Sequence, residues 1–549
     1  MRAELDVTTT PVGAPWVARP PRATGRSWLP GSPDWFELLV LAAFAAVSLW
    51  VVGLDVWQVV AHGRVWTGTD GFYLVDQMQY LAWIQSAAHH GLVANLFVLH
   101  PTAADYFQPA ITISGALSAL GVPPWVSLLL WKPIAVVAAF YGVQAYAYRS
   151  LEGTWPRRVA LLLGLFFGSL TIIYGSRGVL GDLFPAFLSW GYTFGLLAVA
   201  VLLFALVAYG RARAEPERAS RLALWAPGLL GAFASLLHPW QGEMLILLVI
   251  GAELAVWWLE RRRPRLGLPL ITVLVTGAPL LYYEVLGRTD LSWKLARNAS
   301  KHGFSLWTIV LAVLPLLLPA LLAYRIRPRS FLDVVSRVWP GAALVIYVLS
   351  ASSVSATPLH AFEGITVPLS ILAIQGLRGV GFTRLRWSHV LAGLAVAAAT
   401  IPATVSELSE AKSIVAPSPG NANFITRSEQ HALRYLAKNK QPGGVLTRFY
   451  LGSLVPAYTG RRTFVGDCLW SQPGCTPRSQ IAEIVFDGTL PADQARWFVQ
   501  RIGAKFVLTD CSTRPDMSAV LAPLTESVQR FGCAAVYTLR MGGQPSAPA

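Results

Sequence analysis

Runs of apolar residues recur along the first 400 positions of the chain. Each run holds about 20 residues, which is enough for a helix to cross a hydrocarbon layer about 30 Å thick. The pattern predicts eleven membrane spans, at residues 35–54, 124–148, 159–175, 183–209, 222–238, 242–259, 267–286, 304–323, 339–356, 361–377 and 387–403. We therefore expect a mainly α, polytopic helical membrane protein with a membrane domain at 34–403.

The pattern changes after residue 403. Residues 404–423 are rich in Ser, Pro and Asn and predict a linker, and residues 424–549 predict a small α/β domain. The capping-box sequence TRSE at 426–429 predicts a helix that continues through Asn439. Short strands are expected at GVLTR, TFVGD, AKFVLTD and AAVYTLR, and helices at PADQARWFVQRIG and SAVLAPLTESVQRFG. This region contains neither GxGxxG nor the GxxxxGKS/T phosphate loop.

Composition supports the membrane assignment. Hydrophobic residues make up 54% of the chain and charged residues only 13%, whereas a soluble domain carries about 25% charged residues. The 21 tryptophans suit side chains that anchor at membrane interfaces.

The net charge of +15 invites a nucleic-acid interpretation, but its distribution favours membrane orientation. Arginines cluster in alternate short loops between the apolar runs and in the Pro- and Arg-rich segment 1–33, which we expect to be a disordered tail. The loop arginines are Arg149, Arg157, Arg158, Arg211, Arg213, Arg218, Arg221, Arg261, Arg262, Arg263, Arg265, Arg325, Arg327, Arg329, Arg337, Arg378, Arg384 and Arg386. The positive-inside rule then predicts a multi-pass plasma (inner) membrane protein with a cytoplasmic N-terminus, an extracytoplasmic C-terminal domain and no nucleic-acid partner.

The four cysteines all lie in the domain that this orientation places outside the cell. An even number of cysteines in an extracytoplasmic domain predicts disulfides. The simplest pairing is Cys468 with Cys475 and Cys511 with Cys533, although three pairings are available and four buried free thiols are the alternative. Their spacing does not match a paired CxxC zinc site.

The first external loop, residues 55–123, is much longer than two spans need for a connection, and such loops are often functional. Its segment TDGFYLVDQMQYLAWIQSAAHHG, at 69–91, places Tyr80, Trp83, Ile84 and Ala87 on one helical face. This face predicts a helix in the membrane interface, and residues 111–120 predict a second one.

Three segments of the chain resemble the GT-C superfamily of membrane glycosyltransferases: DQMQYLAWIQSAAHHGLVANLF, HAFEGITVPLSILAIQGL and VPAYTGRRTFVGDCLWSQPG. The resemblance implies a GT-C-like membrane domain and a polyprenyl-phosphate-linked sugar bound in a cavity at the outer face. In that superfamily, an acidic residue of the first external loop is the usual catalytic base, or a metal ligand in some branches.

Asp76 is the first candidate for this base, because it lies at the start of the predicted interfacial helix. Asp55 follows the first span closely, and Asp105 lies in the sequence DYFQP of the same loop. Asp70 reads more simply as part of a turn. A helix cap or a solvated loop charge is the alternative role for Asp76.

Basic residues outside the membrane oppose the orientation rule and concentrate in the loop 287–305. Lys294, Arg297 and Lys301 recur at helical spacing, and His302 follows. This set predicts a phosphate site, with anionic lipid headgroups as the alternative ligand. Arg177 is a further candidate for phosphate, unless it pairs with Asp182, and Lys132 inside a span faces either a cavity or the outer interface.

Two similar sequences mark external helix ends, HPWQG from His238 and HAFEG from His360. His238 with Glu243, and His360 with Glu363, are expected to line the cavity, and local helix-entry contacts are the alternative. No HExxH-like spacing supports a metal site, and no cofactor is certain, but a divalent metal (Mg or Mn) stays open.

The sequence thus predicts hexosyl or pentosyl transfer from a polyprenyl-phosphate donor to an extracytoplasmic glycan, lipid or protein, in contact with membrane lipids. The alternatives are a membrane transporter or lipid flippase, or a noncatalytic cell-envelope assembly factor. A transporter is less favoured because the chain shows no half-to-half repeat and its polar residues gather at the outer helix ends.

Overall fold

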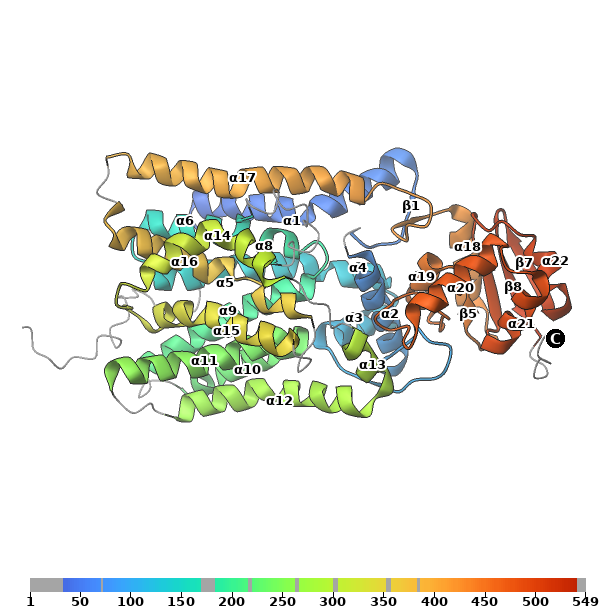
Figure 1. The fold of residues 1–549 in the computed structure, drawn as a ribbon, viewed down its shortest axis with the longest axis horizontal. Helices are drawn as coiled ribbons and strands as arrows, with labels where there is room; N and C mark the ends of the chain where they lie inside the picture. The colour runs from blue at the N-terminus through green and yellow to red at the C-terminus, as the bar shows by residue number, and fades with distance from the viewer. Residues whose placement is uncertain are drawn as a thin grey trace, which may run out of the picture.

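The computed structural model describes residues 33–70, 73–168, 183–215, 220–261, 266–299, 305–351, 357–382 and 386–540. A bundle of long helices forms one end of an elongated molecule, and a small α/β domain forms the other end (Figure 1). The predicted tail at 1–33 falls almost wholly outside the described residues.

Among the described residues, eight helical segments are long and apolar enough to span a membrane. They are α1 (Trp35–His62), α4 with α5 (Pro124–Leu129 and Trp131–Ser150), α9 (Thr193–Ala214), α11 (Pro239–Glu260), α12 (Gly267–Thr289), α14 (Leu306–Ala323), α15 (Phe331–Ala351) and α17 (Ser388–Ile414). The predicted class, a mainly helical polytopic membrane protein, is confirmed.

Three shorter helices overlap the remaining predicted spans: α6 (Thr154–Phe166), α10 (Arg221–Leu237) and α16 (Thr366–Gly379). The total of eleven spans therefore stays a prediction. Helix α17 continues past residue 403 and occupies part of the segment 404–423 that the sequence predicted as a linker.

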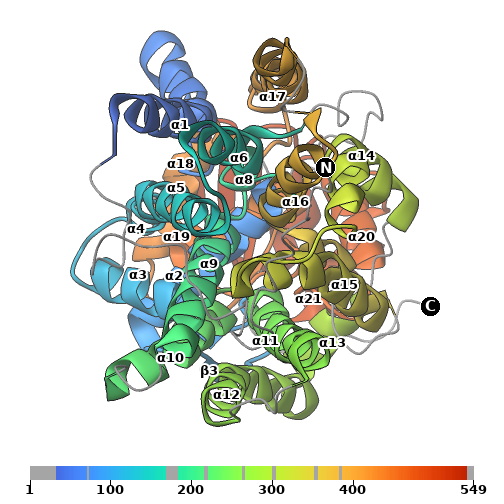
Figure 2. The same ribbon diagram turned by 90° about the vertical axis from the view of Figure 1, so that its left-hand side faces the viewer.

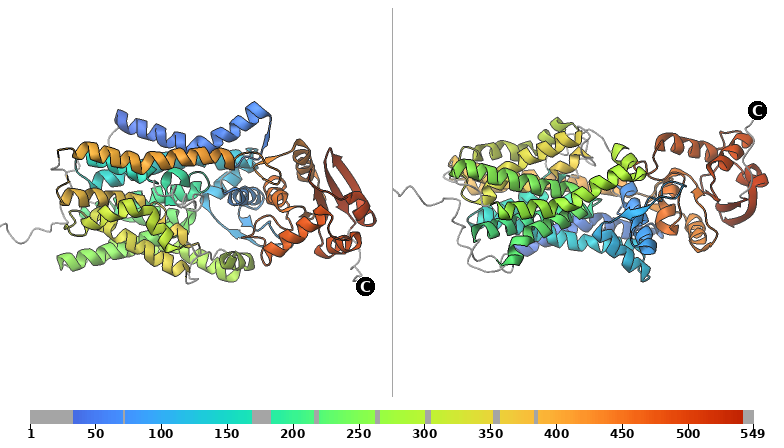
Figure 3. Two further views of the ribbon diagram at one scale, coloured as in Figure 1. Left: turned by 45° about the horizontal axis from the view of Figure 1, so that its top comes forward. Right: turned by 90° about the horizontal axis from the view of Figure 1, so that it is seen from below.

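The bundle surrounds one largely buried helix. Figure 2 looks along the bundle, with α9 near its centre and α1, α12 and α17 at its edge. Most of α9 is buried, which its uniformly apolar sequence allows. Helices α1 and α17 run side by side (Figure 3), and the Trp50 indole N–H donates a 2.9 Å hydrogen bond to the Leu408 carbonyl between them.

The first external loop folds into a layer between the bundle and the α/β domain (Figure 1). Its elements are β1 (Val65–Trp66), α2 (Leu74–His90), β2 (Val93–Ala94), β3 (Ala104–Tyr106) and α3 (Pro109–Ala119). Helices form at both predicted places, but α2 is covered by protein, since its Trp83, Ile84 and Ala87 are buried. Gly115 of α3 permits close approach, because a Cβ there would lie 2.6 Å from the Ala87 Cβ.

Short elements connect the long helices. They are α8 (Pro185–Leu188), α13 (Leu291–Ala299) and the 3-10 helix η4 (Pro358–Phe362).

The C-terminal domain contains a four-stranded sheet flanked by helices. Its elements are β4 (Phe424–Ile425), α18 (Arg427–Lys438), β5 (Val445–Leu446), α19 (Phe449–Thr459), α20 (Cys475–Asp487), α21 (Ala492–Ile502), β6 (Phe506–Thr509), α22 (Met517–Leu521), η6 (Ala522–Leu524), β7 (Thr525–Phe531) and β8 (Ala534–Leu539). The sheet order is β5-β6-β8-β7, with β5 and β6 parallel and the other pairs antiparallel. The Thr426–Glu429 capping box forms as predicted.

Both predicted disulfides, Cys468–Cys475 and Cys511–Cys533, are present. The predicted helix at 518–532 is wrong in its second half, where β7 forms a hairpin with β8. Pro523 lies at the short 3-10 turn that ends this helical stretch, and Gly532 turns the chain back at φ +63°. The predicted strand TFVGD contributes only a single bridge, between Thr463 and Val445.

A second pairing joins the C-terminal domain to the first external loop. Strands β1 and β4 are antiparallel, with Val65 opposite Ile425 and Trp66 opposite Phe424. The Thr67 N–H donates a 3.0 Å hydrogen bond to the Asn423 carbonyl and extends this contact.

Candidate functional site

Asp76 lies in the first turn of α2, in the layer between the bundle and the α/β domain. The Tyr192 hydroxyl donates a 2.8 Å hydrogen bond to its Oδ2 atom. Burial raises the pKa of Asp76, and the Tyr192 hydrogen bond and the nearby His360 oppose that rise. Tyr73, the residue just before α2, has a φ of +44°, a strained value of the kind that gathers at functional sites. The carboxylate is therefore held in place and partly desolvated, as a general base requires.

Two histidines and a glutamate meet beside this carboxylate. His238, between α10 and α11, places its Nδ1 atom 3.3 Å from Glu363 Oε2, and His360 of η4 places its Nδ1 atom 2.7 Å from Glu363 Oε1. The Gln241 amide donates a 3.1 Å hydrogen bond to Glu363 Oε2. All three members of this His–Glu group (His238, His360 and Glu363) are buried.

The His–Glu group has the donor atoms of a metal site. One ligand atom from each residue lies within 4.8 Å of the others. Burial lowers the pKa of His238 to about 4, so its imidazole is neutral at neutral pH, as metal ligation requires. Two imidazoles and one carboxylate suit Zn²⁺ or Mn²⁺ better than Mg²⁺, which prefers oxygen ligands. The same ion-pair contacts also hold the three side chains together without metal.

Tyr192 connects Asp76 with the His–Glu group. Its ring packs edge-on against His360, with ring centroids 5.4 Å apart. It also packs at a tilt against Tyr73, with centroids 4.6 Å apart. Trp240 packs against both histidine rings, at 4.7 Å from His238 and 4.6 Å from His360. The base candidate and the His–Glu group therefore form one continuous site.

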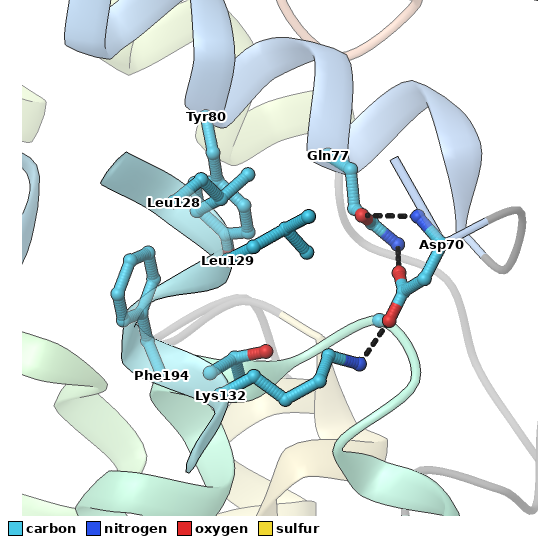
Figure 4. A pocket seen from close by; sticks show the side chains of 9 residues that line it. Asp70, Gln77, Tyr80, Leu128, Leu129, Lys132 and Phe194 are labelled. Atoms are coloured by element: carbon cyan, nitrogen blue, oxygen red, sulfur yellow. Dashed lines mark hydrogen bonds and ion pairs between the residues drawn. The ribbon is translucent and has the colours of Figure 1, made fainter. Parts of the chain in front are cut away.

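A small pocket includes Gly191 and Thr193, the chain neighbours of Tyr192 (Figure 4). It is lined by Asp70, Gln77, Tyr80, Leu128, Leu129, Lys132, Gly191, Thr193 and Phe194. Inside it, the Lys132 ammonium pairs with Asp70 and also donates to the Ser189 carbonyl. Gln77 donates to the other Asp70 oxygen, so a buried polar network fixes α5 against the first external loop.

The other acidic candidates from the sequence have different surroundings. Asp55 is buried near the end of α1, where the Asn423 amide donates a 2.9 Å hydrogen bond to it. Asp105 is half-buried in β3, and the Tyr282 hydroxyl donates to its backbone carbonyl at 2.6 Å. Asp76 is thus the candidate of the first external loop that contacts Tyr192, whose ring packs on His360 of the His–Glu group.

The basic candidates divide into three groups. Arg297 pairs with Glu284 of α12 at 3.0 Å, and Arg288, a further arginine of the loop 287–305, pairs with the same glutamate at 2.6 Å. Lys294 of α13 is exposed. Lys301, His302 and Arg177 lie outside the described residues. Glu363, the predicted partner of His360, contacts both histidine rings. Glu243, the predicted partner of His238, is half-buried on α11. Gln241 of the same helix contacts Glu363.

Two residues of the site, Tyr192 and Asp467, did not emerge from the sequence, and a third, Gln241, was part of the HPWQG pattern without an assigned role. Tyr192 and Gln241 contact the candidate residues from helix ends. Asp467, in the loop before α20, is buried near Asp76, whose charge acts on it. The only signal for Asp467 was its place inside the segment VPAYTGRRTFVGDCLWSQPG.

Comparison with protein-family models finds no match, and comparison with curated protein sequences finds none either. Solved structures, in contrast, share the fold over most of the chain. The oligosaccharyltransferase of Archaeoglobus fulgidus in its apo form has a TM-score of 0.54 at 14% identity, over 89% of this chain and 72% of that chain. The archaeal oligosaccharyltransferase AglB from Archaeoglobus fulgidus, in complex with an inhibitory peptide and a dolichol-phosphate, has a TM-score of 0.52 at 14% identity, over 89% of this chain and 71% of that chain.

ArnT from Cupriavidus metallidurans, bound to undecaprenyl phosphate, has a TM-score of 0.50 at 16% identity. That match covers 91% of this chain and 97% of that chain. At these identities the likeness establishes a shared fold.

Proposed function

We propose, from the GT-C fold that the chain shares with these membrane glycosyltransferases, that it transfers a sugar from a polyprenyl-phosphate donor to an extracytoplasmic acceptor. One observation carries the proposal: a desolvated carboxylate, Asp76, is held by Tyr192 beside a buried His–Glu group at the outer end of a helical bundle. The solved neighbours with bound dolichol-phosphate and undecaprenyl phosphate support a lipid phosphate as the carrier.

The reaction is a displacement at the anomeric carbon of the sugar. Asp76 accepts the proton of an acceptor hydroxyl while the oxygen of that hydroxyl forms a bond to the anomeric carbon. The bond from that carbon to the phosphate oxygen breaks, and the polyprenyl phosphate leaves with the electron pair. Burial makes the Asp76 carboxylate more basic, and the Tyr192 hydrogen bond fixes its direction.

The His–Glu group would hold a divalent cation, with Zn²⁺ or Mn²⁺ preferred for its ligand set. When bound, such a cation supplies positive charge that stabilises the leaving phosphate. Gln241 holds one Glu363 oxygen, and the packed Tyr192 and Trp240 rings exclude water from the imidazoles.

The donor phosphate would reach this site along the outer face of α13. Lys294 is exposed there and can meet a lipid phosphate as a point charge, whereas Arg297 is held by Glu284. The α13 residue Trp293 packs on Trp83 of α2, with ring centroids 5.9 Å apart, so this helix is attached to the layer that carries Asp76.

The proposed location is the plasma membrane, with the N-terminus in the cytoplasm and the C-terminal domain outside. Two disulfides in that domain suit an oxidising compartment. Helix α1 begins at the end of the bundle opposite to this domain (Figure 1). The arginine-rich alternate loops favour the same orientation.

The test is sugar transfer by the purified full-length protein in lipid nanodiscs. A panel of radiolabelled polyprenyl-phosphate sugars serves as donor, and cell-envelope extract serves as acceptor. We expect Asp76→Asn to lose at least about 100-fold in rate, the lower range for a general base. Asp493→Asn, on the exposed face of α21, is the matched control and should retain transfer.

Asp55→Asn and Asp105→Asn run beside these variants. Loss confined to one of them, with Asp76→Asn active, would move the base to that residue. Failure of the folded wild type to transfer sugar from any donor would contradict the enzymatic proposal and favour transport or assembly.

A further inference from the structure

A loop of the C-terminal domain lies directly on the first external loop. This docking loop, residues 463–475, makes three hydrogen bonds to it. The Thr463 N–H donates to the Leu96 carbonyl at 2.9 Å, the Ser471 hydroxyl donates to the Phe97 carbonyl at 3.1 Å, and the Asn95 amide donates to the Trp470 carbonyl at 3.0 Å. The docking loop is therefore fixed to the layer that carries Asp76.

Aromatic packing attaches the docking loop to α2 itself. The Trp470 ring packs edge-on against Trp83 of α2, with centroids 5.4 Å apart, and against Trp293 of α13 at 4.6 Å. All of Trp470 except 4% of its surface is buried in this contact. Such aromatic contacts add about 0.5–1.5 kcal/mol each beyond area burial, which makes the position of the loop well defined.

Asp467 begins the turn within the docking loop and is only 2% exposed. Its Oδ1 atom accepts a 2.7 Å hydrogen bond from the Leu469 N–H. Its Oδ2 atom is fully buried and has no hydrogen-bond partner among the residues that the structure describes. A buried carboxyl oxygen without a partner costs about 1–3 kcal/mol or more, so its retention calls for a role beyond folding.

The charge environment of Asp467 keeps its proton in place. Burial and the nearby Asp76 carboxylate raise the pKa of Asp467 to about 8, while the N–H groups of Leu469 and Trp470 oppose the rise. Among the described residues, Asp76 of α2 is the charged group that acts on Asp467. Asn95 and Phe97, the residues of the first external loop that contact the docking loop, are uncharged. At neutral pH, Asp467 is consequently a carboxylic acid with a hydrogen to donate.

We propose that Asp467 is a substrate-binding residue of the site, supplied by the C-terminal domain, and that its carboxylic acid donates a hydrogen bond to a hydroxyl of the transferred sugar beside Asp76. The inference rests on the proposed glycosyl transfer. Asp76 needs a charged carboxylate to accept a proton, and Asp467 needs a protonated one to donate a hydrogen bond. Two neighbouring carboxyl groups with different environments thus divide these roles.

Two features of the docking loop hold Asp467 in place. The Cys468–Cys475 disulfide closes the loop immediately after it. Before it, Gly466 and Gly452 pack backbone to backbone, since a Cβ on Gly452 would lie 1.8 Å from the Val465 carbonyl oxygen. The backbone on both sides of Asp467 is therefore fixed without a hydrogen bond to its Oδ2 atom from the described residues.

The experiment compares Asp467→Asn with Asp467→Ala in the nanodisc transfer assay across pH 6 to 9. Asn keeps a donor group at the same place, so we expect its kcat/KM at pH 7 to stay within about threefold of wild type. Ala removes the donor, and we expect a loss of about 10-fold or more, the lower range for a lost hydrogen bond to substrate.

The pH profile separates binding from structural support. In the wild type, Asp467 loses its proton as pH rises through about 8, so transfer should fall on the alkaline side. Asp467→Asn should lack this fall, because its amide does not titrate. Equal activity of Ala and wild type, or an alkaline fall that persists in Asp467→Asn, would overturn the inference.

A pair of disulfide variants provides a matched control. Cys468→Ser with Cys475→Ser frees the loop around Asp467, and we expect a loss like that of Asp467→Ala. Cys511→Ser with Cys533→Ser opens the other disulfide of the same domain, and transfer by its folded fraction should be retained. Equal losses from both pairs would point to domain stability and contradict a positioning role.

The two proposals fail in distinguishable ways. An inactive Asp76→Asn together with a fully active Asp467→Ala would refute only the role of Asp467. A wild type without transfer activity would refute glycosyl transfer. The substrate-binding role of Asp467 would then be tested by binding of a radiolabelled polyprenyl-phosphate sugar, measured without turnover. Tenfold weaker binding to Asp467→Ala than to wild type supports the role, and equal binding refutes it.

Discussion

Replacing Lys132 with Met should destabilise the protein strongly, because it leaves the Asp70 carboxyl buried without its ammonium partner. Both side chains of the pair are only 2% exposed, so water cannot replace the lost contact. Removing one partner of a buried ion pair costs about 3–5 kcal/mol. Gln77 still donates to Asp70 in the variant, which compensates only in part.

The size of the stability loss in Lys132→Met follows from the cost of keeping Asp70 protonated. Burial raises the pKa of Asp70, and without Lys132 the main opposing charge is gone. Keeping a carboxyl protonated at pH 7, against an ordinary value of about 3.9, costs roughly 4 kcal/mol at 1.36 kcal/mol per unit. At pH 5 the same calculation gives about 1.5 kcal/mol.

The sign of the pH effect follows from proton binding. Above about pH 4, the unfolded variant releases this proton while the folded variant keeps it. Raising the pH therefore favours the unfolded state, and the loss of stability in Lys132→Met should grow from pH 5 to pH 7.

The assay is thermal unfolding in detergent, followed by tryptophan fluorescence, of wild type, Lys132→Met and the double variant Asp70→Asn with Lys132→Met. We expect the double variant to recover most of the lost stability, because no charge is left unpaired. An unfolding temperature of Lys132→Met equal to wild type at pH 7, or a loss independent of pH, would refute this reasoning.

Three further predictions concern the metal, the docking loop and the donor. Elemental analysis of the purified protein should find bound Zn or Mn, and Glu363→Gln should reduce the amount bound. If protein stripped of metal transfers sugar at the normal rate, a metal has no role in transfer. Gly452→Ala should lower both the unfolding temperature and transfer, because its Cβ would lie 1.8 Å from the Val465 carbonyl oxygen, whereas Gly53→Ala meets open space and should change neither. Lys294→Gln should raise the KM for the lipid donor several-fold with kcat unchanged, while the exposed Lys440→Gln should leave KM unaltered; equal KM values would remove Lys294 from the donor site.

Local signals in the sequence predicted local structure well. Apolar runs located the long helices, and the capping box located the start of α18. The spacing of His360 and Glu363 placed both groups within 2.7 Å of each other, as the i, i+3 geometry predicts. The disulfide pairing followed from cysteines that are close in the sequence.

Contacts between distant segments could not be predicted in the same way. Gln241 and Glu363 are 122 positions apart, and no local pattern shows that their helix ends meet. The apolar face of α2 predicted a helix in the membrane interface, whereas protein covers this face in the structure; the sequence does not separate the two, because lipid and protein cover such a face equally well. Asp467 reaches the site only through the docking of a whole domain, which periodicity does not encode.

The contact between β1 and β4 sets an order for the biogenesis of the protein. Thr67 emerges early in synthesis, but its partner Asn423 follows 356 positions later. At about 5–20 residues per second, roughly 20 to 70 s pass before the partner exists. During that interval, three partners of the first external loop are missing: the strand β4 that pairs with Val65, the Asn423 amide that donates to Asp55, and the cover of α2. The first external loop is therefore inserted early but completes its folding late. A ribosome that stalls before residue 423 leaves the edge of β1 exposed, where quality-control proteases can recognise it.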